Sequence, residues 1–467
     1  MMNENPVRTT LRKIFLPQNI FLLFGSIFGL LFVVITPPFQ VPDEPAHFYR
    51  AYQVSEGTIK GQRQQDALGG LLPKSLVVIS KQISGNIPFH PENKQKIGDI
   101  LRLLRLPLNS SERCFIQFVN TAIQTPLVYI PQAAGIFLGR IISDSVLILV
   151  YLGRLTNLIF WVVLVYHAIK ITPVFKYLFL VLALAPMSLF LAASLSADSL
   201  TNALSFIFIA VCLKFSDGKC ITIKKRELFV LFLLSLMVSL SKQVYFLLAF
   251  LVFLIQPDKV GGRRNKWLIS LTLILLSLVC SAGWLYYIED IYVPFRNGIQ
   301  TQTQLFFILS SPLKYAEILL ETLKEQWKNL LINYVGVLGW LDTFLLQWQY
   351  KYYSVIFIAA ALSDGSEDFR ISLKNRILIF LVFLASVILI FTSQYLSWTL
   401  PKASSIEGLQ GRYFIPVCPL FLLLLYNKKI SQIKVLNKFV FPVKMGFYLS
   451  ITVSLICTIA VLIKRYY

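Results

Sequence analysis

The stretch IFLLFGSIFGLLFVVI, residues 20–35, decides which kind of fold this chain can adopt. It carries no charge and is followed at once by TPPFQVPDEPAHFYR, residues 36–50, where prolines and charged residues return. A helix needs roughly 20 predominantly apolar residues to cross the hydrocarbon core of a bilayer. Residues 20–35 therefore predict a membrane-spanning helix that ends at a polar, proline-rich segment. Because no small-residue cleavage site is evident, we expect this helix to be retained rather than removed as a signal peptide.

The composition extends this prediction to all 467 residues. Apolar residues make up 56% of the chain and charged residues 14%, whereas soluble proteins average roughly 45–50% and about 25%. The sequence predicts an all-α polytopic membrane protein that forms one integral membrane domain over residues 1–467. About eleven apolar runs are candidate spans: 20–35, 146–166, 177–193, 199–213, 228–240, 245–255, 268–288, 353–362, 377–395, 413–425 and 445–463.

Charge patterning sets the expected orientation. A net charge of +21 would suggest nucleic acid in a soluble protein, but membrane proteins concentrate lysine and arginine in cytoplasmic loops. With the N-terminus inside, the inner segments hold 22 Lys and Arg in 82 residues and the outer segments hold 21 in 195. We therefore expect a cytoplasmic N-terminus, which carries Arg8, Arg12 and Lys13, and no nucleic-acid partner. A span at residues 126–142 would invert the later loops, so we interpret that run as a helix at the outer surface.

Two outer segments, 37–145 and 289–351, are much longer than the other loops. Each contains an amphipathic stretch, at 97–106 and 313–333, with apolar residues on one face and charges around it. Such helices are typical of the membrane interface, although ordinary packing against the bundle would give the same pattern. Long external loops favour work done at the external face.

The sharpest group of chemically capable residues follows the first span. Asp43 and Glu44 lie between Pro42 and Pro45, and a helix starting at Pro45 would carry His47 and Arg50 on nearby faces. A rigid acidic pair beside an imidazole suits general-base catalysis or metal binding. The alternative is that Asp43 or Glu44 only caps the new helix.

Other candidate residues are scattered along the chain. Arg154 lies inside an apolar run, where an arginine is costly and marks either a functional site or a structural salt bridge. Lys242 interrupts a long apolar stretch just before Tyr245, so it either ends a span or faces a cavity. Asp198 opens a helix, and capping would equally explain its position.

Two further motifs, GWLDT at 339–343 and QGRY at 410–413, contribute Asp342, Gln410, Arg412 and Tyr413. Arg412 can bind a phosphate with two parallel hydrogen bonds, and snorkelling to the interface is the alternative. The six cysteines have no metal-ligand spacing, and three histidines make a histidine-rich zinc site improbable.

These motifs together resemble the DUF2142 family of predicted bacterial membrane proteins and, more broadly, the GT-C glycosyltransferases, which use sugars carried on polyprenyl phosphates. The matching segments are 40–47, 125–132, 152–155, 185–187 with 196–198, 242–245, 339–343 and 410–413. The resemblance implies a GT-C-like fold and a catalytic acidic residue in the first external loop just after the first span, a role that falls to Asp43 with Glu44 beside it. No clean DxD motif is present, which leaves open whether Mg²⁺ or Mn²⁺ assists.

The resemblance implies transfer of a sugar from a polyprenyl-phosphate donor to a cell-envelope glycan, glycolipid or protein outside a bacterial plasma membrane. Alternatives are a flippase or transporter of lipid-linked sugars, and an oligosaccharide ligase or polymerase. The expected substrate-binding residues are His47, Arg50, Arg154, Asp198, Lys242, Tyr245, Asp342, Gln410, Arg412 and Tyr413.

Overall fold

The computed structural model describes residues 15–365, 369, 371–427 and 440–467. The basic N-terminal residues Arg8, Arg12 and Lys13 lie outside this range. Within it the chain is mostly helical, as an all-α membrane protein should be.

Six helices of the described chain are long and apolar enough to cross a membrane. They coincide with six of the predicted spans, whereas the total of about eleven remains a prediction. The six are α2 (Pro17–Ile35), α8 (Val146–Ile171), α11 (Asp198–Ser216), α13 (Arg263–Tyr287), α17 (Leu373–Ser397) and α21 (Val440–Tyr466).

The other apolar runs form shorter helices. The run at 177–193 breaks before Pro186, because proline supplies no N–H and restricts the residue that precedes it. Lys242 separates two further segments with an extended backbone, at φ −159° and ψ 124°. These shorter helices are α9 (Lys176–Ala183), α10 (Pro186–Ala192), α12 (Lys225–Ser241), η3 (Gln243–Leu254), α16 (Gln347–Ser363) and α18 (Cys418–Leu424). The 3₁₀ helix η4 (Pro257–Val260) lies in the polar segment after η3.

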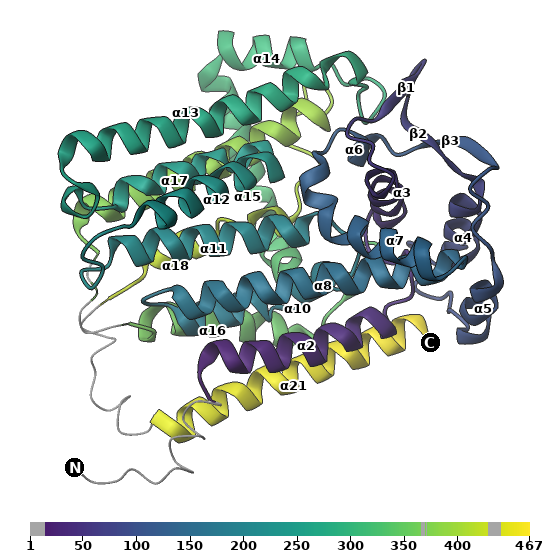
Figure 1. Ribbon diagram of the computed structural model, residues 1–467, viewed down its shortest axis with the longest axis horizontal. Helices are drawn as coiled ribbons and strands as arrows, with labels where there is room; N and C mark the ends of the chain where they lie inside the picture. The colour runs from purple at the N-terminus through teal and green to yellow at the C-terminus, as the bar shows by residue number, and fades with distance from the viewer. Residues whose placement is uncertain (1–14, 366–368, 370, 428–439) are drawn as a thin grey trace.

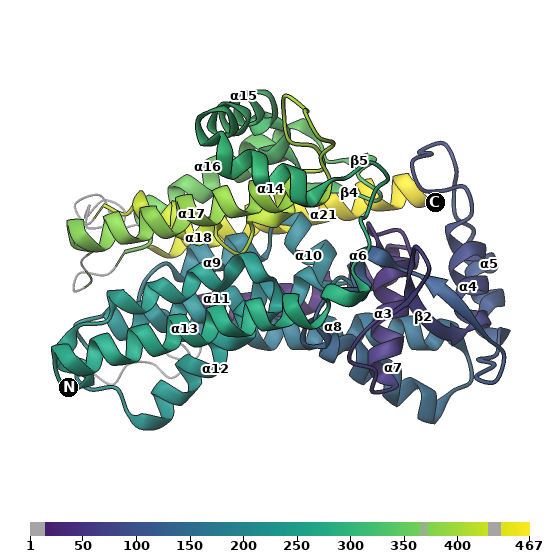
Figure 2. The same ribbon diagram turned by 90° about the horizontal axis from the view of Figure 1, so that it is seen from above.

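The long helices run side by side in two layers, as Figures 1 and 2 show. One layer contains α8, α11, α12 and α13, and the other contains α16, α17, α18 and α21. Helix α11 is almost entirely buried, whereas most residues of α13 and α17 are at least partly exposed. Apolar side chains at the rim of a bundle are what a lipid environment accommodates.

The first long loop folds over one end of the bundle, on the right in Figure 1. Its three-stranded antiparallel sheet pairs β1 with β2 and β2 with β3, and a second hydrophobic cluster lies beneath it. Residues 126–142, predicted as a surface helix, pack on α8 and α3. The elements are α3 (Glu44–Ser55), β1 (Gln62–Gln64), β2 (Ala67–Pro73), α4 (Lys74–Ser84), α5 (Ile97–Arg102), η1 (Leu103–Arg105), β3 (Arg113–Gln117), α6 (Val119–Ala122), η2 (Pro126–Tyr129) and α7 (Ile130–Ile142).

The second long loop contains the long amphipathic helix that its sequence predicts. Leu320, Leu323 and Trp327 on its apolar stripe are 59%, 47% and 50% exposed, so the bundle covers only part of this stripe, including Leu319 and Leu330. Placement at the membrane interface therefore stays the favoured prediction over packing against the bundle. The elements are η5 (Glu289–Ile291), α14 (Thr301–Ser310), α15 (Pro312–Gly336), β4 (Val337–Leu338) and β5 (Thr343–Phe344), and η6 (Gly411–Phe414) follows α17.

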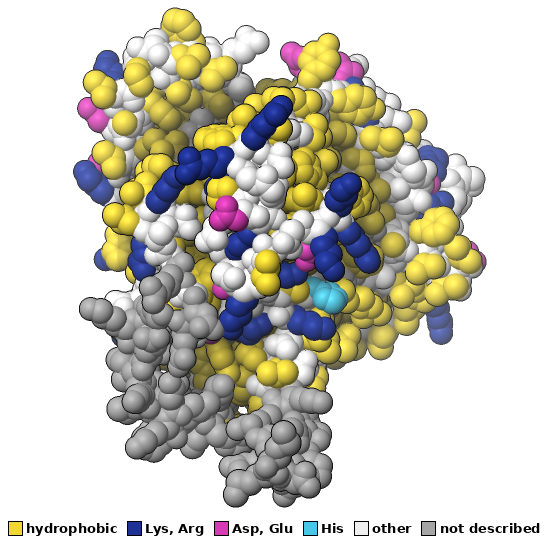
Figure 3. All heavy atoms as spheres, turned by 60° about the vertical axis from the view of Figure 1, so that its left-hand side comes forward, with side chains coloured by type: hydrophobic (Ala, Val, Ile, Leu, Met, Phe, Trp, Pro, Cys, Tyr) yellow, Lys and Arg dark blue, Asp and Glu magenta, His cyan; other side chains and the backbone are white. Residues whose placement is uncertain are grey.

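Helices α2 and α21 lie side by side and run in the same direction (Figure 1). The Tyr448 hydroxyl donates to the Phe15 carbonyl near their starts, and the Tyr466 hydroxyl donates to the Gln40 carbonyl near their ends. The first loop and the C-terminus thus lie at one end of the bundle. Figure 3, which brings the opposite end forward, shows many Lys and Arg side chains and few Asp and Glu.

Candidate functional site

A cavity of about 1180 Å³ lies where the two long loops meet the bundle. Small-molecule sites occupy roughly 300–1,000 Å³, so this cavity has room for a large ligand. Its charged end gathers the candidates Asp43, His47, Asp198, Lys242 and Arg412, together with Gln410 and Tyr413. The sequence places these residues far apart, and the tertiary structure brings them together.

The Arg412 side chain enters the cavity because Gly411 allows close approach of η6 to α15. A Cβ atom on Gly411 would lie 2.2 Å from the Leu330 carbonyl oxygen and 2.3 Å from the Tyr334 nitrogen. Only glycine fits at this distance. A glycine at position 411 is therefore what lets η6 pack this closely against α15.

The Arg412 guanidinium is 5% exposed and lies between two carboxylates. Its Nη2 is 3.5 Å from Asp43 Oδ2, and its Nε is 3.7 Å from Asp198 Oδ2. Among the described residues, neither Nε nor Nη1 has a hydrogen-bond partner. Because a guanidinium has five N–H donors, Arg412 retains unused capacity to bind an anion in the cavity.

The Asp43 backbone has φ 61° and ψ 9°, a left-handed conformation that few non-glycine residues adopt. Asp43 occupies the N-cap position of α3, but its side chain makes no capping hydrogen bond. The expectation that Asp43 or Glu44 caps this helix is therefore wrong. The Asp43 carboxylate is 38% exposed and faces the cavity, so it can contact a ligand.

Glu44 points the other way and pairs with Arg154, and both side chains are fully buried. Arg154 Nε and Nη2 donate to the Glu44 carboxylate at 2.8 and 2.6 Å. The Glu44 carboxylate also accepts from the backbone nitrogens of Phe39 and Leu195. The predicted catalytic role of Glu44 and substrate-binding role of Arg154 receive no support, because neither residue lines the cavity. The salt bridge, the alternative for Arg154, is what the structure contains.

Lys242 both ends a helix and faces the cavity, as its position in the sequence predicts. Its Nζ lies 3.8 Å from Asp198 Oδ1 and 4.4 Å from the centre of the Tyr413 ring. The Tyr245 hydroxyl donates to the Tyr413 carbonyl at 2.7 Å. Tyr245 thus supports the wall of the cavity rather than lining it.

His47 lines the cavity, and burial is the main cause that lowers its pKa below the ordinary value. Arg50, one turn later, turns into the loop instead. It donates to Gln53 Oε1 at 2.5 Å and to the carbonyls of Ile59 and Gln124. Arg50 therefore holds the first loop together and does not reach the cavity.

Asp342 is likewise held outside the cavity. Arg465 Nη2 donates to Asp342 Oδ2 at 2.8 Å, and the Phe89 nitrogen donates to the same oxygen. This contact joins the second loop, the first loop and the C-terminus. The neighbouring Trp340 and Leu341 line the cavity in its place.

The cavity residues do not fit a divalent cation. Among the described residues, no group of three His, Cys, Asp or Glu side chains could hold a metal ion. Asp43 and Asp198 already share the cationic Arg412, whereas Mg²⁺ and Mn²⁺ require oxygen ligands that are free to coordinate them. The cavity carries its positive charge on arginine and lysine.

Sequence reasoning missed the polar residues that the loop before α7 contributes. Gln117, Asn120 and Gln124 line the cavity, and Tyr129 contacts His47 from behind. Gln117 ends the short strand β3 and Asn120 lies in the one-turn helix α6, and elements this short have no periodicity that marks which residues face a ligand. Segment 125–132, which contains Tyr129, stands out in the sequence only through its resemblance to a family.

The apolar end of the cavity is formed by two candidate spans. Leu278, Ala282 and Leu285 of α13 line one wall, and Leu389 and Leu396 of α17 line another. Leu278 and Leu285 are 45% and 52% exposed. A ligand could therefore contact charged groups at one end and apolar helix faces at the other.

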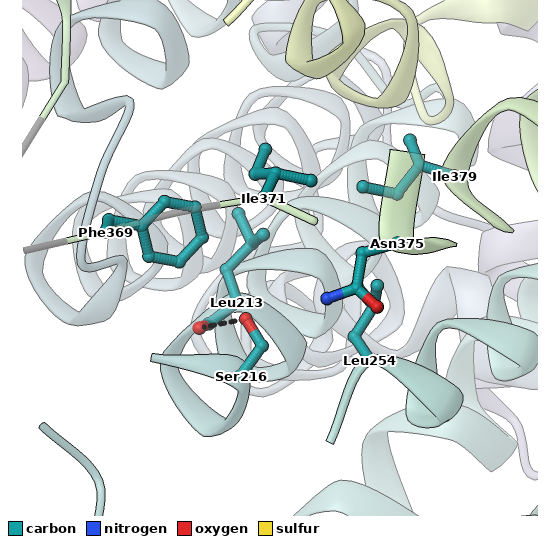
Figure 4. Close-up of a pocket in the computed structure, with 7 residues that line it drawn as sticks. All are labelled: Leu213, Ser216, Leu254, Phe369, Ile371, Asn375 and Ile379. Carbon is teal, nitrogen blue, oxygen red and sulfur yellow. Dashed lines mark hydrogen bonds between the residues drawn. The ribbon is translucent and has the colours of Figure 1, made fainter. Parts of the chain in front are cut away.

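A second cavity, drawn in Figure 4, lies at the opposite end of α11 and measures only about 10 Å³. That volume is about the space for one water molecule. The Ser216 hydroxyl already donates to the Leu213 carbonyl at its edge. Its lining residues are Leu213, Ser216, Leu254, Phe369, Ile371, Asn375 and Ile379, and it is too small for a substrate.

Comparison with known proteins places the chain in a family. Curated proteins and solved structures yield no match. A family model named DUF2142 and described as a predicted membrane protein matches residues 24–421, a segment that contains both Asp43 and Arg412. The chain therefore belongs to the DUF2142 family of predicted membrane proteins.

Proposed function

We propose that this chain is a membrane glycosyltransferase. It transfers a sugar from a polyprenyl-phosphate donor to a cell-envelope glycan, glycolipid or protein. The observation that carries the proposal is that one and the same cavity contains the unused Arg412 donors and the apolar walls on α13 and α17. A lipid phosphate has this pair of features, an anionic head and a long apolar tail.

Arg412 binds the donor phosphate, and Lys242 adds a second positive charge at the same end of the cavity. Asp198, which lies near both cations, keeps them in place and balances their charge before the ligand arrives. The prenyl chain follows the apolar residues of α13 and α17 toward the bilayer. This arrangement stabilises the leaving phosphate, where negative charge develops during the reaction.

Asp43 acts as the general base. The bond between the anomeric carbon and the phosphate oxygen breaks, and a bond from the acceptor oxygen to that carbon forms. The acceptor hydroxyl proton passes to the Asp43 carboxylate, and the prenyl phosphate leaves with the bonding electron pair. The transition state has oxocarbenium character, and direct attack predicts inversion at the anomeric carbon.

We place this reaction at the external face of a bacterial plasma membrane, with a cytoplasmic N-terminus. The basic end of the bundle supports this orientation, because Lys and Arg concentrate on the cytoplasmic side (Figure 3). The cavity lies at the other end, beneath the two long loops.

The test is transfer by purified protein in liposomes. Short-chain polyprenyl-phosphate monosaccharides serve as donors, membrane glycolipids serve as acceptors, and release of free prenyl phosphate is measured. Asp43→Asn should lose transfer, whereas Asp99→Asn, a matched change on the exposed helix α5, should retain it. Unchanged transfer by Asp43→Asn would remove the base assignment.

The same assay separates the alternatives. A flippase or transporter would move the intact donor across the liposome membrane without releasing prenyl phosphate. An oligosaccharide ligase or polymerase, given a lipid donor that carries an oligosaccharide, would release the lipid carrier and extend the acceptor by more than one sugar.

A further inference from the structure

A chain of hydrogen bonds leads away from His47 through the buried Tyr129 to Gln124, which itself lines the cavity. His47 Nδ1 lies 2.8 Å from the Tyr129 hydroxyl, which lies 3.0 Å from Gln124 Oε1. The Gln124 side-chain nitrogen lies 3.2 Å from the Asn120 carbonyl oxygen. Tyr129 is fully buried and His47 is 6% exposed.

The direction of each hydrogen bond follows from the far end of this chain. The Asn120 carbonyl can only accept, so the Gln124 nitrogen donates to it and the Gln124 oxygen faces Tyr129. That oxygen can also only accept, so the Tyr129 hydroxyl donates its single proton there. The proton between Tyr129 and His47 must then come from His47 Nδ1.

This leaves the second ring nitrogen of His47 as an acceptor. Among the residues the structure describes, none makes a hydrogen bond to His47 Nε2. His47 lines the cavity, so this nitrogen is available to a ligand. The neutral state that the argument requires agrees with the lowered pKa of His47.

The charged groups around His47 have opposing effects on its pKa. Burial contributes most to lowering its pKa, and Arg412 lowers it further, while Asp43, Asp198 and Glu44 raise it. The net effect favours the neutral imidazole. Protonation would turn Nε2 from an acceptor into a donor.

We propose that Tyr129 and Gln124 fix His47 as the Nδ1–H tautomer, so that Nε2 binds a hydroxyl group of the acceptor substrate. Tyr129 and Gln124 are positioning residues in this scheme, and of these three residues His47 makes the proposed contact with the acceptor hydroxyl. Naming the ligand as the sugar acceptor rests on the proposed function. The tautomer itself does not, since it follows from the hydrogen bonds alone.

The test is nitrogen NMR of ¹⁵N-histidine-labelled protein in micelles. The chain contains three histidines, so the His90→Gln and His167→Gln double variant leaves His47 as the single signal. At pH 7.5 we expect a protonated Nδ1 and an unprotonated Nε2. An Nε2–H tautomer or an imidazolium in this protein would overturn the proposal.

Tyr129→Phe removes the group that accepts the Nδ1 proton, so the population should shift toward the Nε2–H form. Tyr52→Phe is the matched control, because Tyr52 is buried on the same helix without contacting His47. If Tyr129→Phe and Tyr52→Phe both gave the spectrum of the parent protein, that result would contradict the positioning role of Tyr129. Because the wild-type spectrum decides by itself, the proposal stays testable even if Tyr129→Phe fails to fold.

Activity separates this inference from the proposed function. If sugar transfer is found, acceptor KM should rise as pH falls through the pKa of His47, with a smaller change in kcat. An acceptor KM that stays constant over this range would remove the ligand contact while leaving the transferase assignment intact. If no transfer is found but the Nδ1–H tautomer is present, the proposed function fails and the tautomer stands.

Discussion

The ion pair between Arg154 and Glu44 offers the sharpest test of the structure. Both side chains are 0% exposed, and they belong to segments 110 residues apart in the chain. We consider Arg154→Met, which keeps an unbranched apolar chain of similar reach and removes the charge. The prediction concerns the free energy of unfolding.

The magnitude follows from what Arg154 contacts. It donates five hydrogen bonds, two to Glu44 and three to the carbonyls of Val33, Thr36 and Pro37. Removing one partner of a buried pair costs about 3–5 kcal/mol, because the other charge stays buried without compensation. The two backbone nitrogens that donate to Glu44 offset part of this, so we expect the lower end, about 3 kcal/mol.

The assay is reversible unfolding in mixed detergent micelles with increasing SDS, followed by tryptophan fluorescence. The control is Arg102→Met, which breaks the exposed pair of Arg102 with Asp99. Exposed pairs contribute little, so this variant should unfold close to the parent. The double variant Glu44→Gln with Arg154→Met should lose less free energy of unfolding than the sum of the losses in the two single variants, because the two residues interact directly.

A loss below about 1 kcal/mol for Arg154→Met would refute the reasoning, because that is the size expected of an exposed pair. A double variant with strictly additive losses would also refute it, since additivity means that the two side chains do not interact.

Three further predictions concern the cavity. Gly411→Ala should weaken binding of a short-chain prenyl phosphate, because the added Cβ would lie 2.2 Å from the Leu330 oxygen and η6 would have to move. The control Gly98→Ala should leave this binding unchanged, because a Cβ at Gly98 would meet no atom within 4 Å. Arg412→Lys should weaken the same binding about tenfold to hundredfold, the size of one lost charge-assisted hydrogen bond, and equal affinity in a fluorescence titration would contradict the phosphate role. Because burial lowers the pKa of His47 from 6.5, the unfolded chain binds the extra proton first. The free energy of unfolding should therefore fall by up to about 1.4 kcal/mol per pH unit as the pH drops from 6.5 to the lowered pKa of folded His47, and unfolding curves of His47→Gln should lack this component.

The sequence by itself determined the membrane class and the position of the long helices. A run such as residues 20–35 has no alternative to a helix in a bilayer, because every backbone polar group there must be paired within its own segment. This is a local property of the chain, so α2, α8, α11, α13, α17 and α21 could be located from composition. The runs that form α12, η3, α16 and α18 could also be located, and Lys242 visibly interrupts an apolar stretch. The division of the run 177–193 into α9 and α10 at Pro186 was not expected from composition.

The sequence determined the candidate site only in part. The sequence identified Asp43 and Glu44 as neighbours with the same chemistry, and the left-handed backbone at Asp43 sends the two carboxylates in different directions. Arg154 and Arg412 also looked alike, as arginines inside or beside apolar runs. Arg154 finds a partner for its charge in Glu44, whereas Arg412 keeps donors that no described residue fills.

Only the tertiary structure could decide these roles, because each depends on a partner distant in the chain. Local propensity acts over one or two helical turns, whereas the contact between Arg412 and Asp43 joins residues 369 positions apart. The sequence determines which side chains are costly to leave unpaired in a membrane protein. The fold determines which of them are paired with each other and which remain available to a ligand.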